Sequence, residues 1–312
     1  MNRGSRTGAH DYWAFGLRIR SSTELPELVE AEGDDKPDVV IDYGDIPETV
    51  ETGLTAAGDA LTLSIENVGR YRIERGTRII IDAEPDVPER NVRLFLLGSA
   101  FGALLHQRGL LPLHANAIEL DGRAVAFMGE QGAGKSTLAS WFHDHGYGVL
   151  ADDVCAIGFD SRRHPMVYPG LPRLRLWVDA MSAAGRAPQE YQRSYVDATY
   201  DKFDVPTDPP GQASAGRELA GLYVLDRAED FSIEPLKGVD AMEAVFAHTY
   251  RGAYLGAIGG QQNHWQSCTH LVMRTPVFRL CRPWSLDRLT EDCLRIAEHA
   301  AGLCLHSGVP PL

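Results

Sequence analysis

Hydrophobic and polar positions in the first third of the chain form short runs that are typical of β-strands. Gly, Asp or Pro separates each run from the next, as expected at turns. The predicted strands are Trp13–Ile19, Val39–Tyr43, Ala60–Ile65, Tyr71–Glu74 and Thr77–Asp82. A strongly apolar segment at residues 91–107 follows them and predicts a helix that packs against the resulting sheet.

Beyond residue 110 the pattern changes to alternating strands and helices. An apolar run at Arg123–Met128 predicts a buried strand, and it leads into a glycine-rich stretch that begins at Gly129. Residues 136–145 have apolar side chains three and four positions apart, which indicates a helix of about three turns. Gly146 and Gly148 end that helix, and Val149–Ala151 predicts another short strand.

The remaining segments complete the predicted organisation. Residues 183–214 are polar and rich in turn-forming residues, so we expect a loop there. A strand is predicted at residues 222–225 and an amphipathic helix at residues 286–303. The pattern indicates an α/β fold in two parts. Residues 1–110 form a strand-rich N-terminal region with its connecting helix, and residues 111–312 form a second unit around the glycine-rich stretch.

Composition narrows the class of protein. The 312 residues carry 43 acidic and 30 basic side chains, for a net charge of −13, and no basic stripe that would neutralise nucleic-acid phosphates. The first ten residues lack the apolar core of a secretory signal, and no apolar run is long enough to span a membrane. Five cysteines without metal-ligand spacing indicate reduced thiols. Together these features predict a cytoplasmic protein that binds neither nucleic acid nor membranes.

The glycine-rich stretch Gly-Glu-Gln-Gly-Ala-Gly-Lys-Ser matches the phosphate-binding P-loop pattern, and its strand and helix stand in the required order. In such a loop the backbone amides surround the phosphates, Lys135 reaches the β- and γ-phosphates, and the Ser136 hydroxyl binds Mg²⁺. A chance glycine-rich turn is the alternative, and the flanking strand and helix disfavour it. The residues predicted to bind the nucleotide are Gly129, Glu130, Gln131, Gly132, Ala133, Gly134, Lys135, Ser136 and Thr137.

An acidic pair, Asp152 and Asp153, ends the short strand that follows the helix. Because the helix is brief, the chain returns to the sheet close to the loop and presents both carboxylates there. One carboxylate can hold a metal ion, while the other, beside a like charge, can have a raised pKa and act as a general base. A solvated Asp-Asp turn is the alternative interpretation.

These motifs resemble the kinase core of HPr kinase/phosphorylase, a family that phosphorylates a serine hydroxyl on a protein. The resemblance rests on Leu113-His114, the apolar residues 118–122, the P-loop and the Gly146–Asp153 segment, in the same order and with similar spacing. It implies an HPr-kinase-like core at residues 111–312, with Lys135 at the phosphates and Asp152 as the base. It further implies that Asp153 and Ser136 serve Mg²⁺ and that His114 lies beside the reacting phosphate. ATP-dependent phosphoenolpyruvate carboxykinases share the P-loop and the acidic pair.

A narrower resemblance covers more of the chain. Several segments are similar to HPr-kinase-like proteins encoded with lasso peptides, which phosphorylate a serine of the precursor peptide. The segments are Tyr12–Ile19, Asp38–Ile41, Val92–Gly98, Arg108–His114, Tyr168–Trp177 and Asp201–Phe203. The glutamate-bearing signature of HPr kinases has no clear counterpart, because the nearest segment, Pro169–Trp177, carries Arg173 and Arg175 instead. This departure puts a second acidic metal ligand and the reverse, phosphorylase reaction in doubt.

Several further residues are candidates for contacts with phosphate or substrate. Arg173 and Arg175 lie two apart, on one side of an extended segment, and Lys202 follows in a polar stretch. Arg251 and Arg279 are weaker candidates. Each of these side chains has a simple alternative as a solvated surface cation, and His114 has one as a histidine satisfied by backbone groups.

The hypothesis from the sequence is an ATP- and Mg²⁺-dependent kinase whose substrate is a serine of a lasso-type precursor peptide. Two alternatives stay open, a small-molecule enzyme like phosphoenolpyruvate carboxykinase and a nucleotide-binding regulator with no phosphoryl acceptor. The sequence leaves open the peptide, the nucleotide base and a homo-oligomeric state, since P-loop contacts address phosphates rather than the base.

Overall fold

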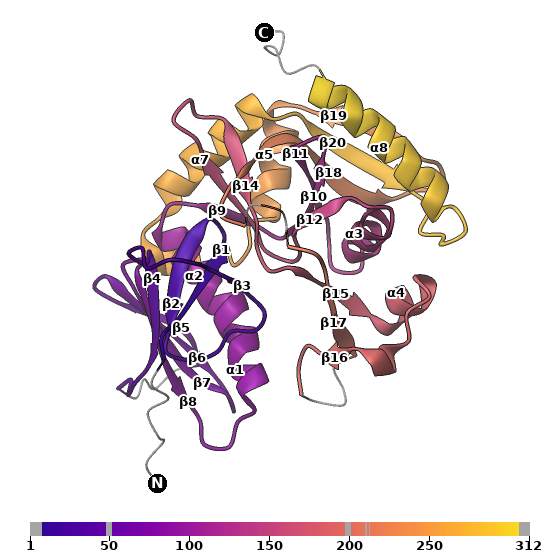
Figure 1. Cartoon of the computed structure of the whole chain (residues 1–312). Helices are drawn as coiled ribbons and strands as arrows, with labels where there is room; N and C mark the ends of the chain where they lie inside the picture. The colour runs from indigo at the N-terminus through magenta and orange to yellow at the C-terminus, as the bar shows by residue number, and fades with distance from the viewer. Residues whose placement is uncertain (1–7, 48–51, 197–200, 210, 212, 306–312) are drawn as a thin grey trace.

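The computed structural model describes residues 8–47, 52–196, 201–209, 211 and 213–305. The protein has a mixed α/β architecture with two large sheets and a small third sheet (Figure 1). The α/β class expected from the sequence pattern is therefore confirmed. In the described part of the chain, no helix is both long and apolar enough to cross a membrane. The five cysteines, all within the described residues, are free thiols.

The first sheet has eight strands in the order β3-β1-β2-β4-β8-β7-β6-β5. Their bounds are β1 His10–Ala14, β2 Leu17–Ser21, β3 Val29–Glu30, β4 Val39–Tyr43, β5 Gly53–Ala57, β6 Ala60–Ile65, β7 Gly69–Glu74 and β8 Arg78–Ala83. The predicted single strand at Trp13–Ile19 is wrong. The chain instead reverses between β1 and β2, where Phe15 and Gly16 both have positive φ.

One helical stretch covers this sheet. It consists of α1 (Glu89–Phe95), a π-helical turn η1 (Leu96–Ala100) and α2 (Phe101–Gln107), which confirms the helix predicted at residues 91–107. Leu96 and Phe101 are fully buried in one core with Ile41 and Tyr71 of the sheet. Since π-turns widen the helix locally, η1 changes which side chains the stretch presents on either side of it.

The second sheet has the order β12-β10-β11-β18-β14-β13-β9, and β20 pairs with both β18 and β19. Its strands are β9 Leu111–Leu113, β10 Ala115–Leu120, β11 Arg123–Met128, β12 Gly148–Ala151, β13 Cys155–Phe159, β14 Pro165–Tyr168, β18 Arg217–Arg227, β19 Ser232–Leu236 and β20 Val277–Arg282. The helices of this part are α3 Lys135–Asp144, α5 Gly238–Ala247, α6 Tyr254–Ile258, α7 Gln261–Arg274 and α8 Leu289–Leu305.

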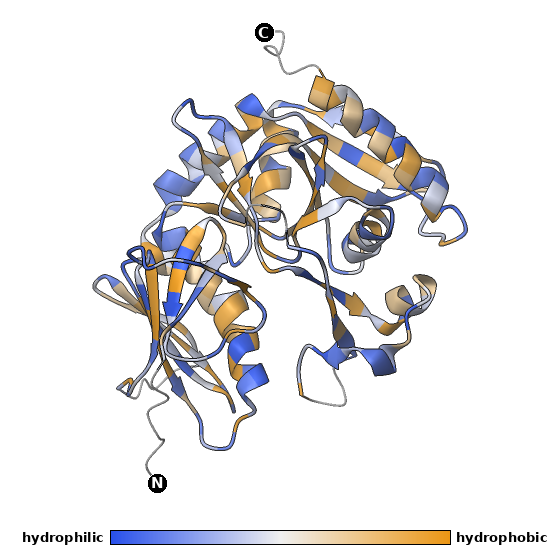
Figure 2. Ribbon diagram, in the orientation of Figure 1, coloured by the Kyte–Doolittle hydropathy of each residue, from blue (hydrophilic) through white to orange (hydrophobic). Residues whose placement is uncertain are grey.

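Both faces of this sheet are covered, as the side chains of β11 show. Ala126 and Met128 lie in the core that α5 and α7 complete, whereas Val125 and Phe127 lie in the core that α3 and α8 complete. A strand buried on both faces needs apolar residues at every position, which explains the unbroken apolar run in the sequence. Figure 2 shows hydrophobic and hydrophilic residues interspersed along α8, as expected for a helix with one buried side.

A three-stranded sheet lies beside α3, in the order β15-β17-β16. Its elements are β15 Arg173–Trp177, β16 Gln192–Arg193 and β17 Lys202–Pro206, with the short helices α4 Val178–Ala183 and η2 Pro188–Glu190. Leu174 and Leu176 of β15 pack with Phe203 and Val205 of β17 against Ala139 of α3.

Most other predicted elements agree with the structure, and one does not. The strand at 222–225 is the centre of the longer β18, and the helix at 286–303 corresponds to α8. The prediction of a loop throughout residues 183–214 is wrong, because β16 and β17 lie within it; residues 197–200, 210 and 212 lie outside the described residues. The alternation of buried Phe203 and Val205 with polar neighbours was the strand signal that the polar composition hid.

Candidate functional site

Three chain segments meet at one edge of the second sheet. β10 runs antiparallel to both β11 and β12, and its first residue, Ala115, lies opposite Met128, the last residue of β11. The start of β10 and the ends of β11 and β12 therefore share an edge. His114, the loop at residues 129–134 and the acidic pair at residues 152–153 all lie at this edge.

The loop ends at the amino terminus of α3. Gly134 occupies the N-cap position with a φ of +86°, and no side chain caps the first turn of the helix. The first amide N–H groups of α3 therefore need an acceptor from outside the helix, and the helix dipole favours an anion there. This end of α3 is suited to a phosphate group.

A glycine is favoured at residue 134 for two reasons, its positive φ and the space that its missing Cβ leaves. A Cβ at this position would lie 2.9 Å from Nη2 of Arg282. Arg282 is buried and forms an ion pair with Asp292, whose Oδ2 lies 3.6 Å from its Nη1. A side chain at residue 134 would thus collide with a buried arginine as well as strain the backbone.

Lys135 lies against the loop that precedes it. Its Nζ donates hydrogen bonds to the carbonyl oxygens of Gly129, at 2.7 Å, and Glu130, at 3.1 Å. The side chain is buried, and burial lowers the pKa of its ammonium group although Asp153 works in the opposite direction. The ammonium group is thereby held against the loop at the start of α3.

The carboxylate of Asp152 is surrounded by hydrogen-bond donors. Its Oδ1 accepts from Nδ2 of Asn116 at 2.8 Å, and its Oδ2 accepts from the backbone N–H of Arg175 at 2.6 Å. The Ser136 hydroxyl donates to the same Oδ1 at 3.4 Å. Asp152 therefore contacts the serine that is predicted to bind Mg²⁺.

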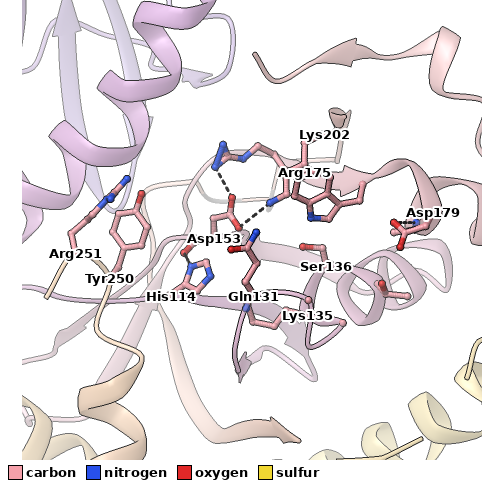
Figure 3. Close-up of a pocket in the computed structure, with 15 residues that line it drawn as sticks. His114, Gln131, Lys135, Ser136, Asp153, Arg175, Asp179, Lys202, Tyr250 and Arg251 are labelled. Carbon is pink, nitrogen blue, oxygen red and sulfur yellow. Dashed lines mark hydrogen bonds and ion pairs between the residues drawn. The ribbon is translucent and has the colours of Figure 1, made fainter. Parts of the chain in front are cut away.

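The carboxylate of Asp153 points toward cationic side chains instead (Figure 3). Its Oδ2 lies 2.5 Å from Nη2 of Arg175, and its Oδ1 lies 3.9 Å from Nζ of Lys202. Asp153 has a φ of +65°, a backbone conformation that costs a non-glycine residue about 1–2 kcal/mol and that Asp tolerates better than most. The positive φ makes two adjacent carboxylates face different surroundings.

These surroundings shift the two carboxyl groups in opposite directions. Loss of hydration on burial, and then the charge of Asp153, raise the pKa of Asp152 to about 7. Burial also acts on Asp153, but Arg175 and Lys202 outweigh it and hold the pKa of Asp153 below its usual value. At neutral pH Asp153 is ionised, while Asp152 exchanges its proton readily.

His114 lies next to this pair. Its Nδ1 is 3.1 Å from the backbone oxygen of Asp153, and because a carbonyl only accepts, Nδ1 carries the proton. Burial, together with the charge of Lys135, lowers the pKa of His114, so the imidazole is neutral at pH 7. Its ring centroid lies 6.2 Å from that of Tyr250.

Tyr250 and Arg251 reach the site from the segment that follows α5 (Figure 3). Arg251 has a φ of +53°, and its Nη2 donates to the Ser99 hydroxyl of η1 at 2.7 Å. A Cβ at Gly102 would lie 2.9 Å from Cε1 of Tyr250, so a glycine in α2 makes room for the ring. The helical stretch that covers the first sheet thus supports this side of the site.

The three-stranded sheet supplies the opposite side. Trp177 of β15 pairs with Lys202 of β17, and Nζ of Lys202 lies 5.4 Å from the centroid of the Trp177 ring. Arg175 and Lys202, both predicted candidates, therefore do meet the acidic pair. Arg173 does not, because its Nη1 pairs with Asp204 at 2.6 Å.

Together these residues enclose a cavity of about 520 Å³ (Figure 3). Its lining consists of His114, Gln131, Gly132, Gly134, Lys135, Ser136, Thr137, Asp153, Arg175, Trp177, Asp179, Ala180, Lys202, Tyr250 and Arg251. Four cationic side chains and two carboxylates line it, in a chain whose net charge is −13. This local excess of positive charge favours a polyanionic ligand.

Some predicted residues lie next to the cavity without lining it. These residues include three of the loop, Gly129, Glu130 and Ala133, and the carbonyl oxygen of Gly129 accepts from Lys135. Asp152 is another, and it contacts the cavity residue Ser136. Of the two weaker candidates, Arg251 lines the cavity, whereas Arg279 is exposed on β20 and does not.

Sequence reasoning missed several residues of the cavity. Trp177 lies two positions after Arg175, so the alternation that places Arg173 and Arg175 on one side of a strand also includes it. Asp179 and Ala180 follow directly, at the start of α4. Tyr250 had no comparable signal, because its place depends on how α5 returns toward β9.

The hydroxyl and carboxylate oxygens at the site suit Mg²⁺ better than a softer metal ion. Within the described residues, no cluster of three or more His, Cys, Asp or Glu side chains could hold a metal by itself. Ser136 and Asp153 do supply a hydroxyl and a carboxylate. Mg²⁺ is usually held by one or two such groups, and phosphate oxygens and water complete its coordination.

Comparison with known proteins found a likeness among solved structures only. No protein-family model matches the chain, and no curated protein sequence matches it. Among solved structures, the chain is similar to the HPr(Ser) kinase/phosphatase from Coxiella burnetii, with 12% identity and a TM-score of 0.30. The match covers 61% of this chain and 97% of that one. A likeness of this extent assigns neither a reaction nor a substrate.

Proposed function

We propose that this protein is a P-loop kinase with an HPr-kinase-like core that transfers a phosphoryl group from ATP to a serine hydroxyl of a lasso-type precursor peptide. One observation carries the kinase assignment. The uncapped start of α3 and the carboxylate of Asp153 line one cavity that has an excess of cationic side chains, and Asp152, whose pKa is shifted the opposite way, lies next to it. The peptide assignment rests on the segments of the sequence that resemble lasso-peptide kinases.

The phosphates of ATP would lie along the loop and the first turn of α3. The amide N–H groups there donate to no capping side chain, so phosphate oxygens would supply the missing acceptors. Lys135 would turn its ammonium group from the loop carbonyls to the β- and γ-phosphates. Gln131, Gly132 and Thr137 line the same part of the cavity.

Ser136 and Asp153 would hold Mg²⁺, as the resemblance to HPr kinases implies. When bound, the ion neutralises charge on the phosphates and fixes their orientation. Asp153 suits this role because its carboxylate is ionised and is already paired with two cations. Arg175 and Lys202 would exchange that carboxylate for oxygens of the transferring phosphoryl group.

Asp152 would act as the base for the incoming serine hydroxyl. A pKa of about 7 allows it to take up a proton at neutral pH, which an aspartate at its ordinary pKa does poorly. Asp152 contacts Ser136 but does not line the cavity. The substrate hydroxyl would therefore meet Asp152 at the edge of the cavity, either directly or through one water molecule. His114, neutral and fixed by the Asp153 carbonyl, would lie beside the reacting phosphate.

The decisive experiment is mass spectrometry of precursor peptides encoded near this gene, after incubation with the protein, ATP and Mg²⁺. A gain of one phosphoryl mass on a serine would establish the reaction. ATP consumption that depends on oxaloacetate would identify a carboxykinase instead. Tight ATP binding without consumption, with every peptide present, would identify a nucleotide-binding regulator.

The raised pKa of Asp152 predicts how the reaction depends on pH. Since a base works only when ionised, kcat/KM should be constant above neutral pH and fall about tenfold for each unit below about pH 7. Steady-state rates measured across this range would show the decline. A profile that stays flat down to roughly pH 5 would remove Asp152 from the role of base.

Arg175 offers a test of the cationic side of the cavity. Its replacement by alanine should lower kcat about a hundredfold or more, because developing charge on the phosphoryl group loses a fixed partner. Arg279→Ala is the matched control, since that arginine is exposed and lies outside the cavity. Equal rates for the two variants would contradict the assignment of Arg175.

A further inference from the structure

A second cavity, of about 350 Å³, lies between α1 and the three-stranded sheet. It shares no lining residue with the cavity described above. Its lining consists of Pro26, Glu27, Arg90, Arg93, Pro172, Arg173, Glu190, Tyr191, Gln192, Asp204 and Pro206. The residues come from both large parts of the chain, so the cavity exists only because the three-stranded sheet faces α1.

The two cavities are consecutive along one face of the β15–β17 pair. Arg175 and Lys202 line the first, whereas Arg173, Asp204 and Pro206 line the second. The residues that alternate with them on β15, Leu174 and Leu176, are buried on the opposite face. The step from Arg175 to Arg173 is two residues of a strand, or about 7 Å, so an extended chain would cross it in roughly two residues.

The second cavity differs in chemistry from the first. Nε of Arg93 donates to both carboxylate oxygens of Glu27, at 2.9 and 3.0 Å, and Asp204 lies 2.6 Å from Arg173 and 3.4 Å from Arg90. Each of these arginines is already paired with a carboxylate, so the charges compensate locally. Because these charges compensate one another, this part of the cavity does not favour a phosphate group.

The rest of the cavity wall combines three prolines and a tyrosine with the polar side chains of Glu190 and Gln192. Pro26 belongs to the N-terminal part, Pro172 precedes β15 and Pro206 ends β17. Tyr191 stands between η2 and β16 in the chain. Binding pockets for side chains are usually built this way, from apolar walls and a few paired polar groups.

We propose that this second cavity binds an apolar or aromatic side chain of the substrate peptide, two or three residues away from the serine that is phosphorylated. The inference rests on the proposed function, because it requires a peptide acceptor at the first cavity. An extended peptide whose serine hydroxyl reaches Asp152 would continue along the face of β15 and β17 and place a neighbouring side chain against the prolines.

The test uses a positional-scanning library of peptides, each with one central serine and one flanking position fixed as a given amino acid. Incubation with the wild-type protein, ATP and Mg²⁺ should show a preference of about tenfold or more for apolar over charged residues at a single position two or three residues from the serine. The other flanking positions should show weaker selection.

Two variants place a charge in the cavity from opposite walls. Pro206→Glu lies at the end of β17 and Pro26→Glu in the N-terminal part, and both prolines are exposed. Each should abolish the apolar preference or shift it toward Lys and Arg at the same position, with unchanged ATP affinity. Pro235→Glu, an exposed proline of β19, is the matched control and should keep the wild-type preference.

The outcomes separate this inference from the function it rests on. If wild-type protein phosphorylates peptides without any positional preference, or if both charged variants keep the apolar preference, the second cavity is not a substrate subsite and the kinase assignment stands. If wild-type protein binds ATP but phosphorylates no peptide of the library or of the neighbouring genes, the peptide-kinase function fails and the inference fails with it.

Discussion

Lys135→Ala is expected to abolish phosphoryl transfer, with a loss of about two to three orders of magnitude or more in kcat/KM. The ammonium group of Lys135 is buried among the loop carbonyls and lines the cavity, so no water-exposed cation can replace it there. Affinity for ATP should fall as well, because the same charge neutralises the β- and γ-phosphates before transfer. Calorimetric titration with ATP and a steady-state assay would measure the two effects separately.

Lys237→Ala is the appropriate control for this variant. Lys237 is exposed at the start of α5, outside the cavity, and its loss removes the same charge from the chain. Thermal melting of both variants would show whether the fold is intact. If Lys135→Ala transfers phosphoryl groups at the rate of Lys237→Ala, the loop does not hold the nucleotide and the proposed site is wrong.

Asp152→Asn is expected to lower kcat by about two to four orders of magnitude while ATP binding is largely preserved. An amide cannot accept the serine proton, but it keeps the size of the carboxylate and part of its hydrogen bonding to Asn116 and Ser136. Comparison of single-turnover rates with nucleotide affinity would separate the chemical step from binding.

Asp153→Asn should give a different result. The Mg²⁺ concentration needed for half-maximal rate should rise, because one of the predicted ligands loses its charge. The charge of Asp153 is one cause of the raised pKa of Asp152, so its removal should also move the fall in activity to lower pH. The reverse pattern, with the chemical step lost in Asp153→Asn and the Mg²⁺ requirement changed in Asp152→Asn, would assign the base to Asp153, which lines the cavity.

The strands and helices that carry the site were predictable because their patterns are local. β4, β6 and β11 agree with the predicted strands at both ends, and α3 begins within one residue of its prediction. A strand buried on both faces, as β11 is, leaves an apolar run that the sequence displays directly. The turn within residues 13–19 was missed, since its positive φ angles interrupt an otherwise apolar run.

The acidic pair shows where sequence reasoning stops. Adjacency along the chain identifies two carboxylates near a phosphate loop, yet their surroundings depend on residues from distant elements. Asn116 of β10 donates to Asp152, whereas Arg175 and Lys202 of the three-stranded sheet pair with Asp153. The opposite pKa shifts follow from these neighbours and from the positive φ of Asp153, none of which spacing can reveal.

By itself, the sequence determined an α/β class, a glycine-rich loop between a strand and a helix, and the candidates for the chemistry. Period and composition encode these features, and both are properties of neighbouring residues. Only the tertiary structure decided that Arg175 joins the acidic pair while Arg173 turns to Asp204, and that Tyr250 and Arg251 close the other side. The reason is that ion pairing and burial depend on which strands and helices pack together. Local sequence patterns do not reveal contacts between residues that are far apart along the chain.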